Sequence, residues 1–139
     1  MRFVVNGGHR LSGRLRVQGA KNSILPILAA CVLCRGRVVL HNCPALSDVL
    51  SAVRILRHLG LSVICDGDEL CVTGAPLSSC EVPKSLMHEM RSSVVFLGAI
   101  LASAGCARVS MPGGCELGPR PIDIHIAALR RLGAVVEDD

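Results

Sequence analysis

The chain has 139 residues, half of them apolar, and a net charge of +4. This length and composition predict one domain's worth of sequence with a substantial buried core. Aromatic residues are nearly absent, which argues against nucleic-acid binding by base stacking. Because the arginines are scattered rather than clustered, we expect small anionic ligands and no nucleic acid as a partner.

The eight cysteines do not follow the pattern of a secreted disulfide protein. The first residues lack the apolar segment of a secretory signal, so we expect reduced thiols in a cytoplasmic protein. Cysteines 31, 65, 71 and 106 lie within apolar runs and are expected to be buried. The longest apolar runs are shorter than the ~20 residues that span a bilayer, so no membrane contact is expected.

The first third of the chain predicts strands and a buried helix. Residues 2–6 and 14–18 alternate enough to form two strands. Residues 22–34 predict a helix, capped by Asn22 or Ser23 and ended near Gly36. This helix is apolar all round, so we expect it to be buried on every side.

A strand, a second helix and a hairpin follow. The strand is expected at residues 38–40, and the helix begins near Ser47 or Asp48. The helical period places its apolar residues on one face, and the helix should end at Gly60. Residues 63–65 and 70–72 are then expected to form a hairpin. The residues expected on the apolar face are Val49, Val53, Leu56 and Leu59.

The pattern then repeats. Residues 91–104 predict another apolar helix, ended by Gly105. Arg108-Val109 repeats Arg37-Val38 after 71 residues, whereas Leu132-Gly133 repeats Leu59-Gly60 after 73. The two extra residues therefore lie in the connecting loop of the second copy, and such insertions commonly carry function. Val135-Val136 would be an outgoing strand without a return strand, so we expect this chain to be part of a longer protein.

That loop places a thiol between glycine and proline residues. Cys115 lies between Gly113-Gly114 and Gly118-Pro119, and Arg120 follows it. A helix should come next, because Pro121 and Asp123 suit a first turn. Its apolar face would consist of Ile122, Ile126, Leu129 and Leu132, with Arg130 and Arg131 turned away. A thiol beside an arginine and a helix N-terminus predicts an anion site with a reactive group at its edge.

Two further basic residues precede apolar helices. Lys21 and Asn22 stand at the start of the first helix, and Arg91 precedes Ser92-Ser93 at the start of a later one. Either group could bind a phosphate or carboxylate, because helix N-termini present free amide groups. A solvated lysine beside an asparagine cap, and a surface arginine beside a serine cap, are the structural alternatives.

Three motifs together resemble a known family. Pro112-Gly113-Gly114-Cys115-x-x-Gly118-x-Arg120-Pro121-x-Asp123-x-His125 resembles the active-site loop of the UDP-N-acetylglucosamine enolpyruvyl transferases. Gln18-Gly19-Ala20-Lys21-Asn22 and Met90-Arg91-Ser92-Ser93 match the same family in the same order. The long motif is specific and the short ones are weak alone.

The resemblance implies an α/β (α+β) fold, an inside-out barrel of β-α-β-α-β-β repeats with sheets outside and helices within. Residues 1–20 would be a strand pair belonging to the second domain of the full-length protein. Residues 21–139 would be an incomplete domain that carries the catalytic loop. One repeat unit would occupy about residues 21–75, and an incomplete one about residues 84–139.

The resemblance also implies a reaction. The enolpyruvyl group of phosphoenolpyruvate moves to the 3-hydroxyl of UDP-N-acetylglucosamine with release of phosphate, the first committed step of peptidoglycan synthesis. Cys115 would be the proton donor and the thiol alkylated by fosfomycin. Phosphoenolpyruvate would contact Lys21, Asn22 and Arg120. The UDP-sugar would contact Arg91, Arg120, Pro121, Ile122, Asp123 and Ile124. The family's catalytic aspartate and a further arginine lie in the other domain, so this chain alone is expected to be inactive.

Several other interpretations fit the same residues. Cys31, Cys34, His41 and Cys43 could bind zinc, but their apolar surroundings favour a core role. No Gly-rich nucleotide loop is present, and no cofactor is expected. The shikimate-pathway enolpyruvyl transferases share the fold but lack the cysteine loop. A non-catalytic binding or regulatory protein that keeps the loop is the rival from another class, and His125 receives no assigned role.

Overall fold

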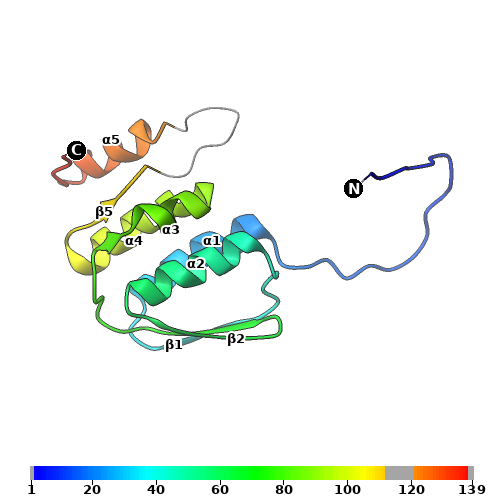
Figure 1. The fold of residues 1–139 in the computed structure, drawn as a ribbon, viewed down its shortest axis with the longest axis horizontal. Coiled ribbons are helices and arrows are strands. Elements are labelled where there is room, and N and C mark those ends of the chain that lie inside the picture. Colours follow the sequence, from blue (N-terminus) through cyan, green and yellow to red (C-terminus); the bar gives the residue numbers. More distant parts are fainter. Residues whose placement is uncertain (1, 112–120, 138–139) are drawn as a thin grey trace.

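The computed structural model describes residues 2–111 and 121–137, and its elements are stacked in layers (Figure 1). A three-stranded antiparallel sheet forms one outer layer, and helices cover one of its faces. The elements, in chain order, are α1 (Lys21–Ala30), the 3-10 helix η1 (Cys31–Leu33), β1 (Arg37–Leu40), α2 (Ser47–His58), β2 (Ser62–Asp66), β3 (Glu69–Thr73), β4 (Glu81–Val82), α3 (Lys84–Glu89), the 3-10 helix η2 (Arg91–Val94), α4 (Val95–Ala104), β5 (Arg108–Val109) and α5 (Asp123–Arg131).

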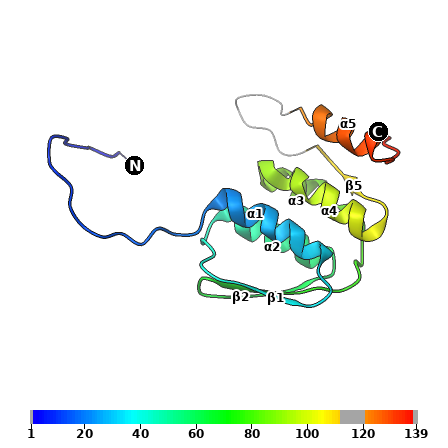
Figure 2. The same ribbon diagram turned by 180° about the vertical axis from the view of Figure 1, so that it is seen from behind.

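Residues 2–20 form an extended segment that leads away from the layers (Figure 2). The predicted strands 2–6 and 14–18 are therefore wrong for this chain. A strand needs a neighbour for its backbone groups, and the apolar side chains of this segment stay exposed, with Phe3 at 78% and Leu15 at 89%. That residues 1–20 belong with a second domain stays a prediction.

Helix α1 buries one face rather than all of its surface. Leu25 and Leu28 are buried, whereas Ile27 is 44% exposed and Leu33, in η1, is 51% exposed. The prediction of burial on every side is therefore wrong within this chain. The helix also begins at Lys21 after an extended Ala20, without a side-chain cap, so the predicted cap at Asn22 or Ser23 is wrong as well.

The main sheet has the strand order β1-β3-β2, and its register places valines together. Val72 of β3 is opposite both Val38 of β1 and Val63 of β2. Side chains alternate between the two faces of a strand, so these valines face the helices together. The predicted strand at 38–40 and the predicted hairpin are confirmed, with Gly67 adopting a positive φ of 56° in the turn.

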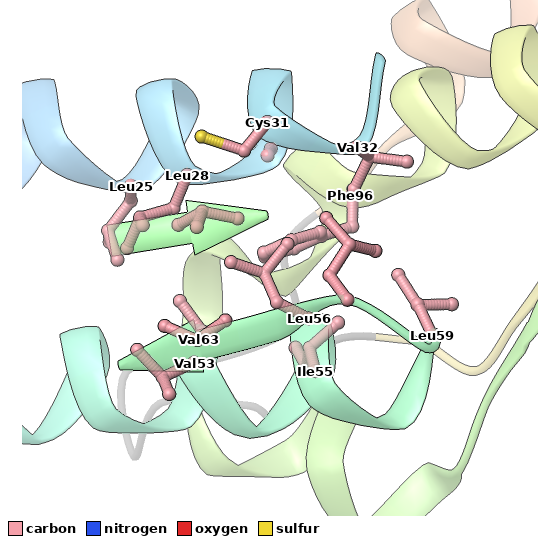
Figure 3. Close-up of a cluster of buried hydrophobic side chains, with 14 of the residues drawn as sticks. Leu25, Leu28, Cys31, Val32, Val53, Ile55, Leu56, Leu59, Val63 and Phe96 are labelled. Carbon is pink, nitrogen blue, oxygen red and sulfur yellow. The ribbon is translucent and has the colours of Figure 1, made fainter. Parts of the chain in front are cut away.

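Helix α2 provides the centre of the core. Val53 and Leu56 of α2, and Leu59 directly after it, belong to one buried cluster with Leu28 of α1 and Phe96 of α4 (Figure 3). The whole predicted face is buried, which confirms the helical period read from the sequence. Burying each large aliphatic side chain stabilises the fold by ~1.5–3 kcal/mol, so this face alone largely accounts for the docking of α2.

A second layer of helices lies on the first. Helices η2 and α4 confirm the helix predicted at 91–104, although its first turn is a 3-10 helix. Gly105 ends α4 in the left-handed region, with a φ of 75°. Strand β4 and the short helix α3 were not predicted. β4 pairs in parallel with β5, with Glu81 opposite Arg108.

The backbone hydrogen bonds that end α2 recur at the end of α5. The amide of Leu61 donates to the Leu56 carbonyl at 3.0 Å, and the amide of Ala134 donates to the Leu129 carbonyl at 3.1 Å. Gly60 and Gly133, at the same place in each copy, have φ values of 99° and 96°. The repeat is therefore confirmed in the backbone. The predicted strand at Val135-Val136 is wrong, because residues 134–137 form no ladder with the described strands.

Candidate functional site

The predicted binding residues that the structure describes all lie at helix starts. Lys21 and Asn22 begin α1, Arg91 begins η2, and Asp123 begins α5. Helices α1, α2, α4 and α5 run in the same direction in both ribbon views, so their N-terminal ends face the same end of the molecule (Figure 1). Helix N-termini carry a partial positive charge, and this end is therefore suited to anionic groups.

Lys21 is fixed by a carboxylate that the sequence did not single out for this role. Its Nζ lies 2.6 Å from Oδ2 of Asp48, in the first turn of α2. The lysine side chain is 48% exposed and the aspartate side chain 19% exposed. An ammonium group has three donors, so an ion pair with Asp48 leaves Lys21 able to bind an anion as well. The sequence indicated Asp48 only as a helix cap, because nothing in its spacing shows that α1 and α2 begin side by side.

Gly19 in the motif before Lys21 has a packing role. A Cβ at Gly19 would lie 2.1 Å from the carbonyl oxygen of Asn42, a contact that no side chain can make. Asn42 itself adopts a positive φ of 57°. The backbone around Gly19 therefore passes directly against the segment after β1, and this close approach fixes where α1 begins.

Arg91 and the two serines after it differ in their exposure to solvent. The extended backbone of Met90 separates α3 from η2, and Arg91 is exposed at the break. Ser93 is buried, and its Oγ donates a 2.8 Å hydrogen bond to the Met87 carbonyl. Ser93 therefore closes the α3–η2 connection instead of facing an anion, and only Arg91 and the partly buried Ser92 remain accessible at this helix start.

The start of α5 presents its motif residues to solvent. Asp123 and His125 are exposed, and Ile124 is 82% exposed. Pro121 lies before the helix, where Ile122 is the flanking residue. The predicted apolar face is present but only half-buried at Ile122, Ile126 and Leu129, and Leu132 is 84% exposed. Cys115 and Arg120 lie outside the described residues, so their roles stay predictions.

The remaining cysteines divide into buried and accessible thiols. Cys31 and Cys43 are buried as core residues, and burial together with Cys34 raises the pKa of Cys31 to about 11. Cys65 and Cys106 are exposed, so the prediction that they are buried is wrong. Both stand next to chain reversals, Cys65 near the hairpin turn and Cys106 directly after Gly105, where neighbouring elements no longer cover them.

The four residues considered as zinc ligands divide between the core and the surface: Cys31 and Cys43 are buried, Cys34 is half-buried and His41 is exposed. The Cys43 thiol donates to the Leu40 carbonyl at 3.4 Å, and His41 Nδ1 lies 2.6 Å from Glu69 Oε1. Within residues 2–111 and 121–137, no three candidate ligands come close enough together to hold a metal ion. The helices described there are also all too short or too polar to cross a membrane.

Comparisons with known proteins agree with the motifs. A family model described as EPSP synthase (3-phosphoshikimate 1-carboxyvinyltransferase) matches residues 5–139. UDP-N-acetylglucosamine 1-carboxyvinyltransferase 2 of Caldanaerobacter subterraneus is 47% identical over 99% of this chain, which covers 33% of that protein. UDP-N-acetylglucosamine 1-carboxyvinyltransferase of Cellvibrio japonicus is 42% identical, with the same shares covered.

A solved structure shares the fold. The enolpyruvyl transferase NikO from Streptomyces tendae has a TM-score of 0.76 at 26% identity, with 96% of this chain and 29% of that chain covered. The chain thus spans about a third of the length of the curated relatives it matches. The predicted α/β class and the resemblance are both confirmed. On the match of the family model to residues 5–139, the chain belongs to the EPSP synthase family of enolpyruvyl transferases.

Proposed function

We propose that this chain is part of an enzyme that transfers the enolpyruvyl group of phosphoenolpyruvate to the 3-hydroxyl of UDP-N-acetylglucosamine and releases phosphate. The observation that carries this proposal is the 47% identity, over 99% of the chain, to a UDP-N-acetylglucosamine 1-carboxyvinyltransferase. The reaction would place the enzyme at the first committed step of peptidoglycan and cell-wall synthesis, in the cytoplasm, with links to cell shape and division.

In this proposal the helix starts bind the anionic parts of both substrates. Lys21, held by Asp48, and Asn22 would contact phosphoenolpyruvate together with Arg120. Arg91, Arg120 and residues 121–124 would contact the UDP-sugar. The common direction of the helices supports this, because partial positive charges at their N-termini stabilise bound phosphate and carboxylate groups.

The chemistry would be an addition followed by an elimination. Cys115 donates a proton to the methylene carbon of phosphoenolpyruvate, and the sugar hydroxyl attacks the neighbouring carbon. The resulting tetrahedral intermediate then loses phosphate and a proton of the new methyl group, which forms the carbon–carbon double bond of the enol ether product. A positioned proton donor contributes ~10²–10⁴ to such a rate. Cys115 would also be the site of alkylation by fosfomycin.

The 139-residue chain alone is not expected to catalyse the reaction. It covers a third of its full-length relatives, and the catalytic aspartate and an additional phosphate-binding arginine are expected in the part that it does not cover. The activity proposed here therefore belongs to the longer protein.

The second candidate is transfer to shikimate 3-phosphate, because the matching family model is described by that reaction. The Gly-Gly-Cys loop at residues 113–115 argues against it. The candidate from another class is a binding protein without catalysis. One chimera can separate the three, in which this chain replaces the matching third of the Caldanaerobacter transferase.

Phosphate release by the chimera is measured with phosphoenolpyruvate and either UDP-N-acetylglucosamine or shikimate 3-phosphate. We expect turnover with the first acceptor, a loss of ~10²–10⁴ in kcat for Cys115→Ser, and little change for the matched control Cys65→Ser, an exposed thiol on β2. We also expect fosfomycin to label Cys115 and not Cys65. Turnover with shikimate 3-phosphate alone would support the second candidate. A folded chimera with no turnover on either acceptor would favour the binding protein.

A further inference from the structure

Cys80 and Cys106 are distant in sequence, but the small parallel sheet brings them together. Cys80 directly precedes β4, and Cys106 lies two residues before β5. The amide of Arg108 donates a 2.8 Å hydrogen bond to the carbonyl of Cys80, which continues the register in which Glu81 is opposite Arg108. The two backbones are therefore held side by side where the cysteines occur.

An ion pair strengthens the same alignment. Arg108 Nη1 lies 3.7 Å from Glu81 Oε2 across the two strands. A disulfide needs Cα atoms ~4.4–6.8 Å apart, and neighbouring strands are ~4.7–4.9 Å apart. In this register Cys80 is opposite Ala107, so Cys106 is its diagonal neighbour on the adjacent backbone. With ~3.3 Å of rise per residue added to the strand spacing, such a diagonal pair of Cα atoms falls roughly within the range that a disulfide spans.

The two thiols already contact each other. The Cys106 thiol forms a hydrogen bond with the Cys80 thiol, and this bond, followed by desolvation and the nearby charge of Cys80, raises the pKa of Cys106. Cys106 is exposed and Cys80 partly buried, so small reagents can reach the pair. Cys31 and Cys43, by contrast, are buried in the core.

We propose that Cys80 and Cys106 form a reversible disulfide when the chain meets a low-molecular-weight disulfide as oxidant. The thiolate of one cysteine attacks the small disulfide, forms a mixed disulfide and releases one small thiolate. The second cysteine loses its proton to water and attacks the mixed disulfide, which releases the second small thiolate. The protein loses two electrons and two protons, and the small disulfide gains the two electrons.

This proposal does not depend on the transferase reaction. Neither cysteine is among the residues assigned to substrate, and disulfide formation can be measured without turnover. The disulfide would close a loop over residues 81–105, which contains α3, η2 and α4. It would therefore tie the two ends of the second helical layer together.

The test uses the reduced 139-residue chain and oxidised glutathione. After incubation, free thiols are alkylated in denaturant and the chain is digested with trypsin without reduction. Cleavage should leave Cys106 in peptide 92–108 and Cys80 in peptide 58–84, which also contains Cys65 and Cys71. Tandem mass spectrometry then identifies which sulfur of peptide 58–84 is linked to Cys106.

We expect the Cys80–Cys106 link to exceed glutathione adducts of either cysteine by at least about tenfold, because the partner thiol is held at a high effective concentration. The Cys80→Ser variant should leave Cys106 as a glutathione adduct, whereas Cys65→Ser, an exposed thiol elsewhere, should keep the link. Equal linkage of Cys106 to Cys65, Cys71 and Cys80 in the wild-type chain would overturn the proposal. A wild-type chain in which Cys106 stays as a glutathione adduct would also overturn it. Both results are obtained with the wild-type chain, so neither depends on the folding of a variant.

Discussion

The two copies of the repeat share their backbone endings but differ in burial. Leu56 of α2 is fully buried, whereas its counterpart Leu129 of α5 is only half-buried. Each backbone hydrogen bond that ends α2 nevertheless has a counterpart at the end of α5. Local sequence therefore sets where a helix ends, while the burial of a helix face depends on which elements lie against it.

Truncating the two equivalent leucines should give the largest contrast. Leu56→Ala leaves a cavity in the core and should lower the free energy of unfolding by ~2–5 kcal/mol. Leu129→Ala removes a half-exposed side chain and should lower it by about 1 kcal/mol or less. Urea unfolding followed by circular dichroism measures both. Equal losses would show that α5 is packed as firmly as α2.

Substituting the two equivalent glycines should give a smaller contrast. Both have a positive φ, so alanine at either position is strained by ~1–2 kcal/mol. A Cβ at Gly60 would also lie 2.8 Å from Ser78 Oγ, whereas a Cβ at Gly133 has open space. Gly60→Ala should therefore lower the thermal midpoint more than Gly133→Ala. The double variant Gly60→Ala, Ser78→Ala removes the Oγ contact but keeps the Ser78 Cβ and amide nitrogen at 3.1 and 3.2 Å, so it should recover part of the difference. A failure to recover would show that the contact with Ser78 Oγ is not its source.

The ion pair between Arg54 of α2 and Glu89 of α3 joins the two copies and should give the smallest effect. The Arg54 guanidinium, followed by Ser51, lowers the pKa of Glu89 below its usual value of 4.5. Glu89→Gln should lower the free energy of unfolding by at most about 1 kcal/mol near neutral pH, as expected for a pair that is partly solvated.

The pH dependence of that variant follows from the direction of the pKa shift. A carboxylate with a depressed pKa stabilises the folded state fully above its ordinary, unfolded-state pKa of 4.5, and this stabilisation is lost as pH falls through the lower folded pKa. The difference between wild type and Glu89→Gln should thus be constant above about pH 5 and shrink below it. A difference that grows on acidification would contradict the assignment.

The candidate site was predicted in parts. The sequence located Lys21 and Arg91 at helix starts, because each stands just before an apolar run. It did not reveal the pairing of Lys21 with Asp48, since that contact depends on α1 and α2 beginning beside each other. It also presented Ser93 as an accessible hydroxyl, whereas the hydrogen bond to the Met87 carbonyl buries it.

The sequence alone was enough to predict helices α1, α2, α4 and α5, the hairpin, the repeat and the family, although it did not reveal α3 or β4. These follow from short-range patterns, namely the apolar period, the glycines that need a positive φ, and the motifs around Lys21, Arg91 and Cys115. Which helix faces are buried and which segments pair could be seen only in the tertiary structure. Residues 2–20 form no strands because no described segment pairs with them, and α1 keeps one face open. Cys80 meets Cys106 because β4 and β5 align in parallel. An apolar period predicts which face of a helix can be buried, but whether that face is covered and which strands pair depends on partners far along the chain.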